Sequence, residues 1–499
     1  GFFPVYLAGQ AEMRSGGTGE PPQGEIRKYK AASVSEGKRG CNCGSIEVFS
    51  DDLIFAFLLH LIVLKYIPAD FIIYILVKGV HTMKLSLSNI GKIGTADIEI
   101  DGITVIAGEN NTGKSTVGRA LFSVFNSYSN IQNQLYQERV TSVDNILNSF
   151  SRENRFFIDS SDEASTIVKK APSFQSHPDF LYHEISDFAA SFEENFSKDF
   201  PVDECVKRIT EILNISDSDL TKSLLEKHLY TEFNGQVGNI FSNSEGRIDL
   251  YIKDQHTTIF IFDNHVSEIE SSENFSLHTE VIYIDDPFII DESRFPIYRF
   301  PFSIYSDHRS HLRQKLFYPK KDSNIVDEIV TANKLESIYS KLSTVCSGNI
   351  VNEKRYKIGY QRAGSDKILD VRNLSTGLKS FVILKTLLIN SAIDRNGTII
   401  LDEPEIHLHP EWQLLFAELI VLIQKEFNLH VLLNTHSPYF LRAIQVYSAK
   451  YDTINRCKYY LSSVSDDIAT LEDVTNSVDK IYAKLSYPLQ QLENVRWES

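Results

Sequence analysis

Cysteine and positive charge are both scarce in this chain of 499 residues. Five cysteines are spread along it and only Cys41 and Cys43 lie close together, so the spacing provides neither a disulfide framework nor a four-ligand zinc site. This pattern suits a reducing cytoplasm, where we expect the protein to act. Lysine and arginine number 50 against 66 aspartates and glutamates, a formal net charge of -16. Such a balance disfavours a surface covered by nucleic acid, although it leaves room for a local basic groove.

A hydrophobic run long enough to cross a membrane is also missing from the apolar stretch at 53–80. Two lysines, a proline and an aspartate divide it into arms shorter than the roughly 20 residues that a membrane helix needs. The preceding residues are rich in glycine, serine and glutamate and show no hydrophobic periodicity. We therefore predict that residues 1–82 form an N-terminal extension outside the catalytic core, with a translation artefact as one origin. A membrane anchor is the alternative.

Ordered patterning begins at Met83, and 42% hydrophobic residues are typical of a globular protein. Apolar residues alternate in 84–90 and 95–100 and run continuously in 103–107, which predicts two half-exposed strands and one buried strand. Apolar residues at helical spacing predict a helix over 115–125. A glycine-rich loop therefore joins a buried strand to a helix.

That loop, Gly-Glu-Asn-Asn-Thr-Gly-Lys-Ser-Thr at 108–116, fits the phosphate-binding pattern G-x-x-x-x-G-K-[ST]. Its glycines let backbone N–H groups surround the phosphates, Lys114 reaches the β- and γ-phosphates, and the Ser115 hydroxyl binds Mg²⁺. A glycine turn before an ordinary helix is the alternative, but a chance match in a chain of this length is expected only about 2% of the time. The candidate ATP-binding residues are Gly108, Asn110, Asn111, Thr112, Gly113, Lys114, Ser115 and Thr116.

A second element is the apolar strand predicted at 398–401, which ends in Asp402 and Glu403 and resembles a Walker B motif. By this resemblance Asp402 holds Mg²⁺, and Glu403 positions and polarises the water that attacks the γ-phosphate. Taken alone, an Asp-Glu pair at a strand end is usually solvated. Its place downstream of a phosphate loop makes it informative.

A third element, Leu-Ser-Thr-Gly-Leu-Lys at 374–379, precedes a helix predicted over 378–392 and resembles the signature motif of the ABC ATPase superfamily. The resemblance implies that Ser375 and Gly377 bind the γ-phosphate held by the phosphate loop of a partner subunit. An N-cap serine and a turn glycine are the plainer interpretation. Both can hold, because a helix N-terminus attracts anions in either case.

The fourth element is His436, which follows a strand predicted at 430–434 and resembles the switch histidine that senses the γ-phosphate. A lone histidine is more often structural, but the order of the four elements is that of an ABC head. The match covers about 83–125 and 355–441. It implies a homodimer or higher even oligomer that sandwiches ATP. The catalytic candidates are Lys114, Glu403 and His436.

Departures from the ABC transporter pattern narrow the resemblance. Asn111 and Thr376 replace glycines, and Glu-Ile-His-Leu-His-Pro at 405–410 stands where transporters carry a different loop. These motif sequences are similar to those of the soluble SMC, RecF and OLD-like ATPases, which are often labelled AAA family. His407 and His409 suggest a metal pair, but the proline that follows suits a first helical position, and we interpret them as loop and interface residues.

A long acidic segment at 126–351 separates the matched regions, with helices predicted over 181–196 and 203–215. Basic residues gather at 308–321, which we interpret as a solvated helix face balanced by acidic neighbours, with DNA binding as the alternative. The fold class is α/β: an ABC-type P-loop NTPase head with a large, mostly helical insertion between Walker A and the signature. The predicted segments are the extension (1–82), the N-terminal head part (83–125), the insertion (126–351), the C-terminal head part (352–445) and a C-terminal tail (446–499).

Three classes of ATPase compete for this pattern. A transporter domain would place far fewer residues between phosphate loop and signature. A repair ATPase with a long coiled-coil arm would show sustained heptads, which the insertion lacks. Many OLD proteins end in a nuclease domain, and the residues after His436 are too few for one.

The preferred hypothesis is a dimeric, ATP-hydrolysing protein that regulates a separate nuclease effector. In this it would be similar to the ATPase subunits of bacterial phage-defence systems such as Septu. ATP and Mg²⁺ are the expected cofactors, DNA is a further candidate partner, and no membrane partner is expected. The alternatives are a nucleotide-gated scaffold with little turnover and a RecF-type DNA-repair ATPase.

Overall fold

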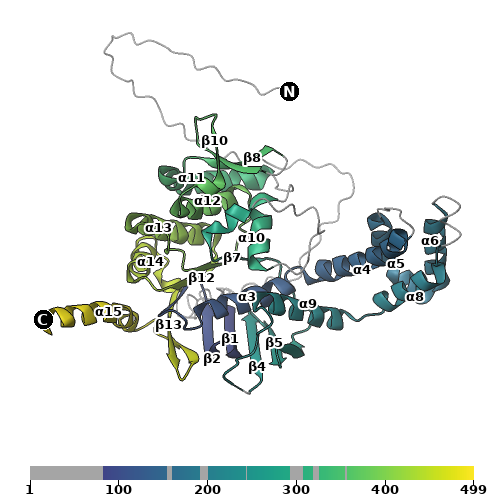
Figure 1. Cartoon of the computed structure of the whole chain (residues 1–499), viewed down its shortest axis with the longest axis horizontal. Coiled ribbons are helices and arrows are strands. Elements are labelled where there is room, and N and C mark those ends of the chain that lie inside the picture. Colours follow the sequence, from purple (N-terminus) through teal and green to yellow (C-terminus); the bar gives the residue numbers. More distant parts are fainter. Residues whose placement is uncertain are drawn as a thin grey trace, which may run out of the picture. The chain divides into compact units, whose positions relative to one another are not determined.

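The computed structural model describes residues 83–153, 160–191, 200–242, 244–292, 307–318, 325–354 and 357–498. The predictions for residues 1–82, and the basic residues Lys320 and Lys321, lie outside them. The α/β fold predicted from the sequence is confirmed, because an 11-stranded sheet carries helices on both faces (Figure 1). No helix in the described ranges is both long and apolar enough to span a bilayer.

The strands that carry the sequence motifs form the parallel half of this sheet. In spatial order they are β13 (Cys457–Ser465), β3 (Ile103–Gly108), β12 (His430–Thr435), β11 (Thr398–Asp402) and β7 (Val281–Ile284), and each is parallel to its neighbours. Thr435 of β12 pairs with Ala107 of β3, and Asp402 of β11 pairs with Asn434 of β12. The phosphate loop, the Asp-Glu pair and the histidine turn therefore all follow the carboxyl ends of these strands, which is where open α/β sheets bind ligands.

The other half of the sheet is largely antiparallel. It continues from β13 through β14 (Ile468–Asp473), β2 (Ile93–Ile100), β1 (Met83–Ile90), β4 (Gly246–Ile252), β5 (Gln255–Phe262) and β6 (His265–Ser271). Leu85 of β1 and Ile98 of β2 face each other in the core, whereas Lys84 and Asp97 point to solvent. The predicted half-exposed strands are thus confirmed, since one face of each is buried.

Helices cover both faces of the parallel strands because side chains alternate along a strand. Ile106, Leu432 and Ile400 share a core with α3 (Lys114–Tyr128), the helix that follows the phosphate loop. Their neighbours on each strand point the other way. These oppositely directed side chains share a second core with α10 (His308–Phe317), α11 (Ile325–Val345), α12 (Thr376–Ile389), α13 (Pro410–Phe427) and α14 (Pro438–Lys450).

Four helices form an arm with a hydrophobic core of its own. They are α4 (Ile131–Glu153), α5 (Ser161–Ser176), α6 (Asp179–Ala190) and α8 (Val202–Leu213), and they lie together in Figure 1. The helices predicted over 181–196 and 203–215 fall on α6 and α8, within the described residues. The next helix, α9 (Asp217–Glu232), packs along α3 and also contacts α4. It connects the arm to the sheet.

The remaining elements flank the signature motif and the chain end. A separate three-stranded sheet consists of β8 (Asn349–Lys354), β9 (Lys357–Gln361) and β10 (Ile368–Asp370). Short 3₁₀ helices lie at η1 (Pro287–Glu292), η3 (Val371–Asn373) and η4 (Ile454–Arg456), and the last helix is α15 (Asp479–Glu498).

The sheet does not follow the segment boundaries drawn from the sequence. Strand β7, from the segment read as an insertion, pairs with the Asp-Glu strand β11, and β4 pairs with β1. Strand β13, from the segment read as a tail, pairs with β3 along its whole length up to Gly108. Local hydrophobic pattern identifies a strand but not its partners, which are set by contacts distant in sequence.

Candidate functional site

The phosphate loop turns tightly between β3 and α3. Gly113 has φ 81°, a left-handed conformation that favours glycine, and a Cβ there would lie 3.0 Å from Ile93. A Cβ on Gly108 would lie 2.5 Å from the carbonyl oxygen of Ser462 on β13. The Ser462 hydroxyl in turn donates a hydrogen bond of 2.5 Å to the Thr112 carbonyl. The tail strand therefore forms the wall behind the loop, and the two glycines are required by close packing.

Lys114 begins α3 and is only 4% exposed. Its Nζ donates hydrogen bonds to the carbonyl oxygens of Glu109, at 2.7 Å, and Gly108, at 3.2 Å. The same nitrogen lies 3.6 Å from Oε1 of Glu403. The ammonium is thus held inside the curve of the loop, where phosphate oxygens can replace the two carbonyls as acceptors.

Asp402, at the end of β11, is buried and accepts a hydrogen bond at each carboxylate oxygen. The Tyr283 hydroxyl donates to Oδ2 at 2.9 Å, and the Asn434 amide donates to Oδ1 at 3.0 Å. Burial and the neighbouring carboxylate raise the pKa of Tyr283 well above its ordinary value, which keeps the phenol protonated as the donor. The orientation of Asp402 is therefore fixed from both sides.

Glu403 leaves the strand in a left-handed conformation, with φ 49°, and its backbone N–H donates to the Asn434 carbonyl at 2.9 Å. Oε1 of Glu403 lies 3.6 Å from Nζ of Lys114 and 3.3 Å from Nδ1 of His436. Lys114 and His436 thus converge on one carboxylate oxygen of Glu403, and all three residues were predicted from the sequence.

Glu405 is a part of the site that sequence reasoning missed. Its carboxylate is 2% exposed, and Oε1 accepts hydrogen bonds from the Thr435 hydroxyl and, at 3.3 Å, from the backbone N–H of His436. Burial raises the pKa of this carboxyl group. The signal was present in the unusual 405–410 loop, but the sequence could not show that its first residue anchors the histidine turn.

Ser375 and Gly377 lie at the N-terminus of α12, as predicted, away from the three convergent residues. The Ser375 side chain makes no capping hydrogen bond, and a Cβ on Gly377 would lie 3.0 Å from the carbonyl oxygen of His407. Ser375, Thr376, Gly377, His407, His409 and Trp412 line a shallow depression of about 460 Å³. The two histidines thus lie beside the signature residues.

The residues at the phosphate loop fit a hydrated Mg²⁺ ion. Among the described residues, no group of three or more histidine, cysteine or acidic side chains could enclose a metal ion. Magnesium instead suits one or two carboxylates together with substrate phosphates and water. Asp402 supplies an oriented carboxylate near the sheet edge, and Ser115, in the first turn of α3, supplies a hydroxyl.

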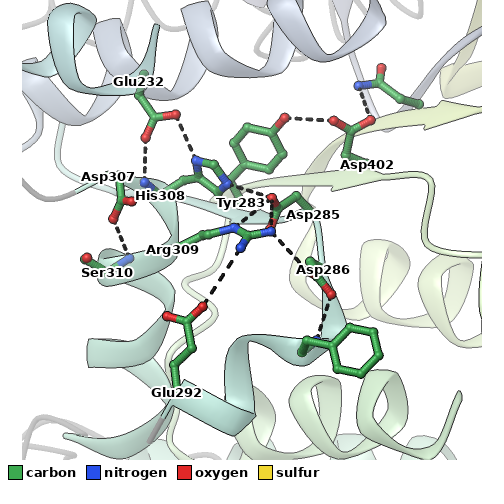
Figure 2. Close-up of polar contacts among 12 residues, drawn as sticks. Glu232, Tyr283, Asp285, Asp286, Glu292, Asp307, His308, Arg309, Ser310 and Asp402 are labelled. Carbon is green, nitrogen blue, oxygen red and sulfur yellow. Dashed lines mark hydrogen bonds and ion pairs between the residues drawn. The ribbon is translucent and has the colours of Figure 1, made fainter. Parts of the chain in front are cut away.

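A buried charged cluster adjoins Asp402 (Figure 2). The His308 imidazole stacks on Tyr283 with ring centroids 4.4 Å apart, Nδ1 lies 2.8 Å from Glu232, and Nε2 lies 3.1 Å from Asp285. Burial opposes the charge on His308, but the adjacent carboxylates of Asp285 and Glu232 outweigh it and raise the pKa to about 9. Arg309 binds Asp285 and Asp286.

This cluster corrects the interpretation of the basic segment. His308 and His311 are buried rather than solvated. The other predicted feature, balance by acidic neighbours, holds for the described part, since Arg309 pairs with aspartates, Arg313 with Glu292, and Lys315 with Glu280. These basic side chains are thus committed to carboxylates of the same chain.

Comparisons with known proteins identify the family of the chain. A family model described as AAA ATPase domain, AAA_15, matches residues 83–441, well over half of the chain. Septu protein PtuA of Bacillus thuringiensis is 29% identical over 144 residues, which are 25% of this chain and 35% of that protein. The match therefore spans about a third of the relative's length.

Two solved SMC heads are also similar in structure. One, bound to the C-winged helix domain of ScpA, is 12% identical with a TM-score of 0.41, and the match covers 80% of this chain and 99% of that one. The SMC head domain from Thermotoga maritima is 11% identical with a TM-score of 0.34, over 79% and 98% of the two chains. These scores are low, and they identify no functional residue.

Proposed function

Because this chain belongs to the AAA ATPase domain family, we propose that it hydrolyses ATP to ADP and phosphate with Lys114, Glu403 and His436 as catalytic residues. One observation carries the proposal. The Glu403 carboxylate lies 3.6 Å from the Lys114 ammonium and 3.3 Å from the His436 imidazole, at the carboxyl ends of adjacent parallel strands. This is the edge at which open α/β sheets bind ligands.

Each side chain has a distinct part in the proposed reaction. Lys114 neutralises charge on the β- and γ-phosphate oxygens, and the loop from Gly108 to Thr116 surrounds them with backbone N–H groups. Glu403 orients the attacking water and takes up its proton as the bond between the γ-phosphorus and the bridging oxygen breaks. His436 hydrogen-bonds the γ-phosphate. Mg²⁺ held by Ser115 and Asp402 supplies further positive charge when it is bound.

The proposed active form is a dimer in which Ser375 and Gly377 of one subunit complete the site of the other. The uncapped Ser375 hydroxyl and the N–H groups at the start of α12 suit an anion. Gly377 allows the start of α12 to lie against the backbone carbonyl of His407, which a side chain at this position would strike. ATP closes this dimer and hydrolysis reopens it.

Phosphate release by the full chain tests the proposed reaction. Glu403→Gln keeps the size of the side chain but cannot take up a proton, so we expect turnover to fall about a hundredfold or more, while a fluorescent ATP analogue still binds. Glu268→Gln, an exposed carboxylate on the edge strand β6, is the matched control and should hydrolyse ATP like the wild type. Equal turnover by Glu403→Gln and the wild type would show that the assignment of Glu403 is wrong.

The proposed biological role is regulation of a separate nuclease effector in cytoplasmic phage defence. Its support is the partial match to Septu protein PtuA. Phage plating on cells that carry this gene with its neighbours tests the role. We expect protection to be lost with Lys114→Ala. Protection that persists with this variant would contradict a role for ATP.

The second candidate is a nucleotide-gated scaffold with little turnover. It is favoured by the direct contact between Lys114 and Glu403, because this contact engages the carboxylate oxygen that would orient the attacking water. A wild-type chain that binds ATP and dimerises but releases no phosphate above the Glu403→Gln level would favour this scaffold over the ATPase.

A further inference from the structure

Tyr283 joins the charged cluster to the proposed metal ligand Asp402. Strands β7 and β11 pair in parallel with Tyr283 opposite Ile400, so the tyrosine ring lies on the face of the sheet that also presents Asp402. Its hydroxyl donates to Oδ2 of Asp402 at 2.9 Å, and the side chain is 1% exposed. A water molecule cannot readily replace this donor in so tight a site.

The Tyr283 ring is held between two helices. On one side the backbone of α3 comes so close that a Cβ on Gly118 would lie 3.1 Å from the tyrosine hydroxyl and 3.2 Å from Cζ. On another side the His308 imidazole stacks on the ring, with an interplanar angle of 26° and 4.4 Å between centroids (Figure 2). The position of the hydroxyl therefore depends on the position of His308.

His308 is anchored in turn by α9. Glu232, the last residue of that helix and 4% exposed, accepts hydrogen bonds from the His308 backbone N–H, at 2.5 Å, and pairs with Nδ1, at 2.8 Å (Figure 2). Asp285 holds the other imidazole nitrogen at 3.1 Å. The row Glu232, His308, Tyr283 therefore runs from the C-terminal end of α9, a helix that packs along α3 and also contacts α4 of the arm, to Asp402.

We propose that Tyr283 is a positioning residue for Mg²⁺ binding by Asp402, and that the Glu232–His308 pair holds it in place from the helix that connects the arm to the sheet. The proposal rests on the proposed function of Asp402 and adds residues that touch neither nucleotide nor metal. A core role in stability alone is the competing explanation.

The test compares ATP affinity with and without Mg²⁺, so that it does not depend on turnover. A fluorescent ATP analogue is titrated into the full chain in excess Mg²⁺ and in EDTA. Tyr283→Phe keeps the ring and removes only the hydroxyl. Loss of one hydrogen bond to a carboxylate should weaken binding of the Mg²⁺ complex about tenfold and leave binding in EDTA unchanged.

Tyr128→Phe is the matched control. Tyr128 is buried in the same core, and its hydroxyl bonds Thr257 and Ser271 instead of a metal ligand. We expect it to lower thermal stability without changing the ratio of the two affinities. A Tyr283→Phe protein with the same ratio as Tyr128→Phe overturns the proposal.

His308→Gln tests the anchoring step and does not alter Tyr283 itself. Its control is His311→Gln on the same helix, since His311 pairs with Glu280 at 2.8 Å and, like His308, packs edge-on against Phe122. We expect only His308→Gln to weaken Mg²⁺-dependent binding, and equal effects of the two variants contradict the anchoring. A wild type that gains no affinity from Mg²⁺ overturns the assignment of Asp402 and this proposal together, whereas equal ratios in the tyrosine variants overturn this proposal alone.

Discussion

The ammonium of Lys114 lies 3.6 Å from the carboxylate of Glu403. One residue begins the helix after the phosphate loop and the other follows the strand β11, so the contact exists only because β3, β12 and β11 are neighbours in the sheet. In the proposed reaction the γ-phosphate competes with Glu403 for this lysine. Binding of ATP would then release the carboxylate to act on water.

Replacing Lys114 by alanine should weaken ATP binding by about ten- to a hundredfold, because charge-assisted hydrogen bonds to phosphate are lost. Titration of a fluorescent ATP analogue measures this. Lys484→Ala is the control, since Lys484 pairs with Glu109 of the same loop at 3.3 Å but is exposed. If both variants bind ATP equally poorly, loop charge rather than the Lys114 position explains the loss.

Replacing Glu405 by alanine should lower both stability and turnover. The Thr435 hydroxyl and the His436 N–H would lose their acceptor in a buried site, which costs about 1–3 kcal/mol of unfolding free energy. Glu405→Gln keeps an acceptor oxygen and should retain most of both. Urea unfolding and phosphate release are the measurements. Equal losses of turnover in the two variants would mean that losing the hydrogen bonds to the histidine turn does not explain the lower turnover of Glu405→Ala.

Stability should fall as pH rises through about 9 because His308 loses its proton there. Its folded-state pKa lies above the ordinary value of 6.5, so the stabilisation is complete below pH 6.5 and is lost as pH rises through about 9. The groups that face the ring are Glu232, Asp285 and Tyr283. The shift corresponds to on the order of 3 kcal/mol.

Urea unfolding at several pH values between 6 and 10 checks this. The difference in unfolding free energy between the wild type and His308→Gln should shrink over that range. A difference that stays constant with pH would show that His308 is not charged in the folded protein.

The sequence predicted the strands and helices that carry the motifs because their patterns are local. The strands predicted at 398–401 and 430–434 lie within β11 and β12, and Lys114, Glu403 and His436 meet as the strand order requires. Each strand and helix is indicated by a pattern within a short stretch of sequence. The meeting of the three residues was expected only from the resemblance to ABC heads.

The partners of these residues could not be predicted, because they come from distant segments. Tyr283 was not among the candidate residues, and His308 was predicted only as part of a basic run, yet their rings stack beside Asp402. Likewise Ser462, from a segment in which no chemistry was visible, supports the phosphate loop at Thr112. Burial and pairing turn a charge run into a structural cluster, and neither is visible in sequence.

Mixing two inactive variants tests most directly whether Lys114 of one subunit and Ser375 of another form one site. Lys114→Ala and Ser375→Arg are each expected to hydrolyse little ATP as pure proteins. In an equal mixture, half of the dimers contain one intact composite site, so the account predicts recovery of about a quarter of the wild-type rate. A mixture that stays at the level of the separate variants, although subunits exchange, would contradict it.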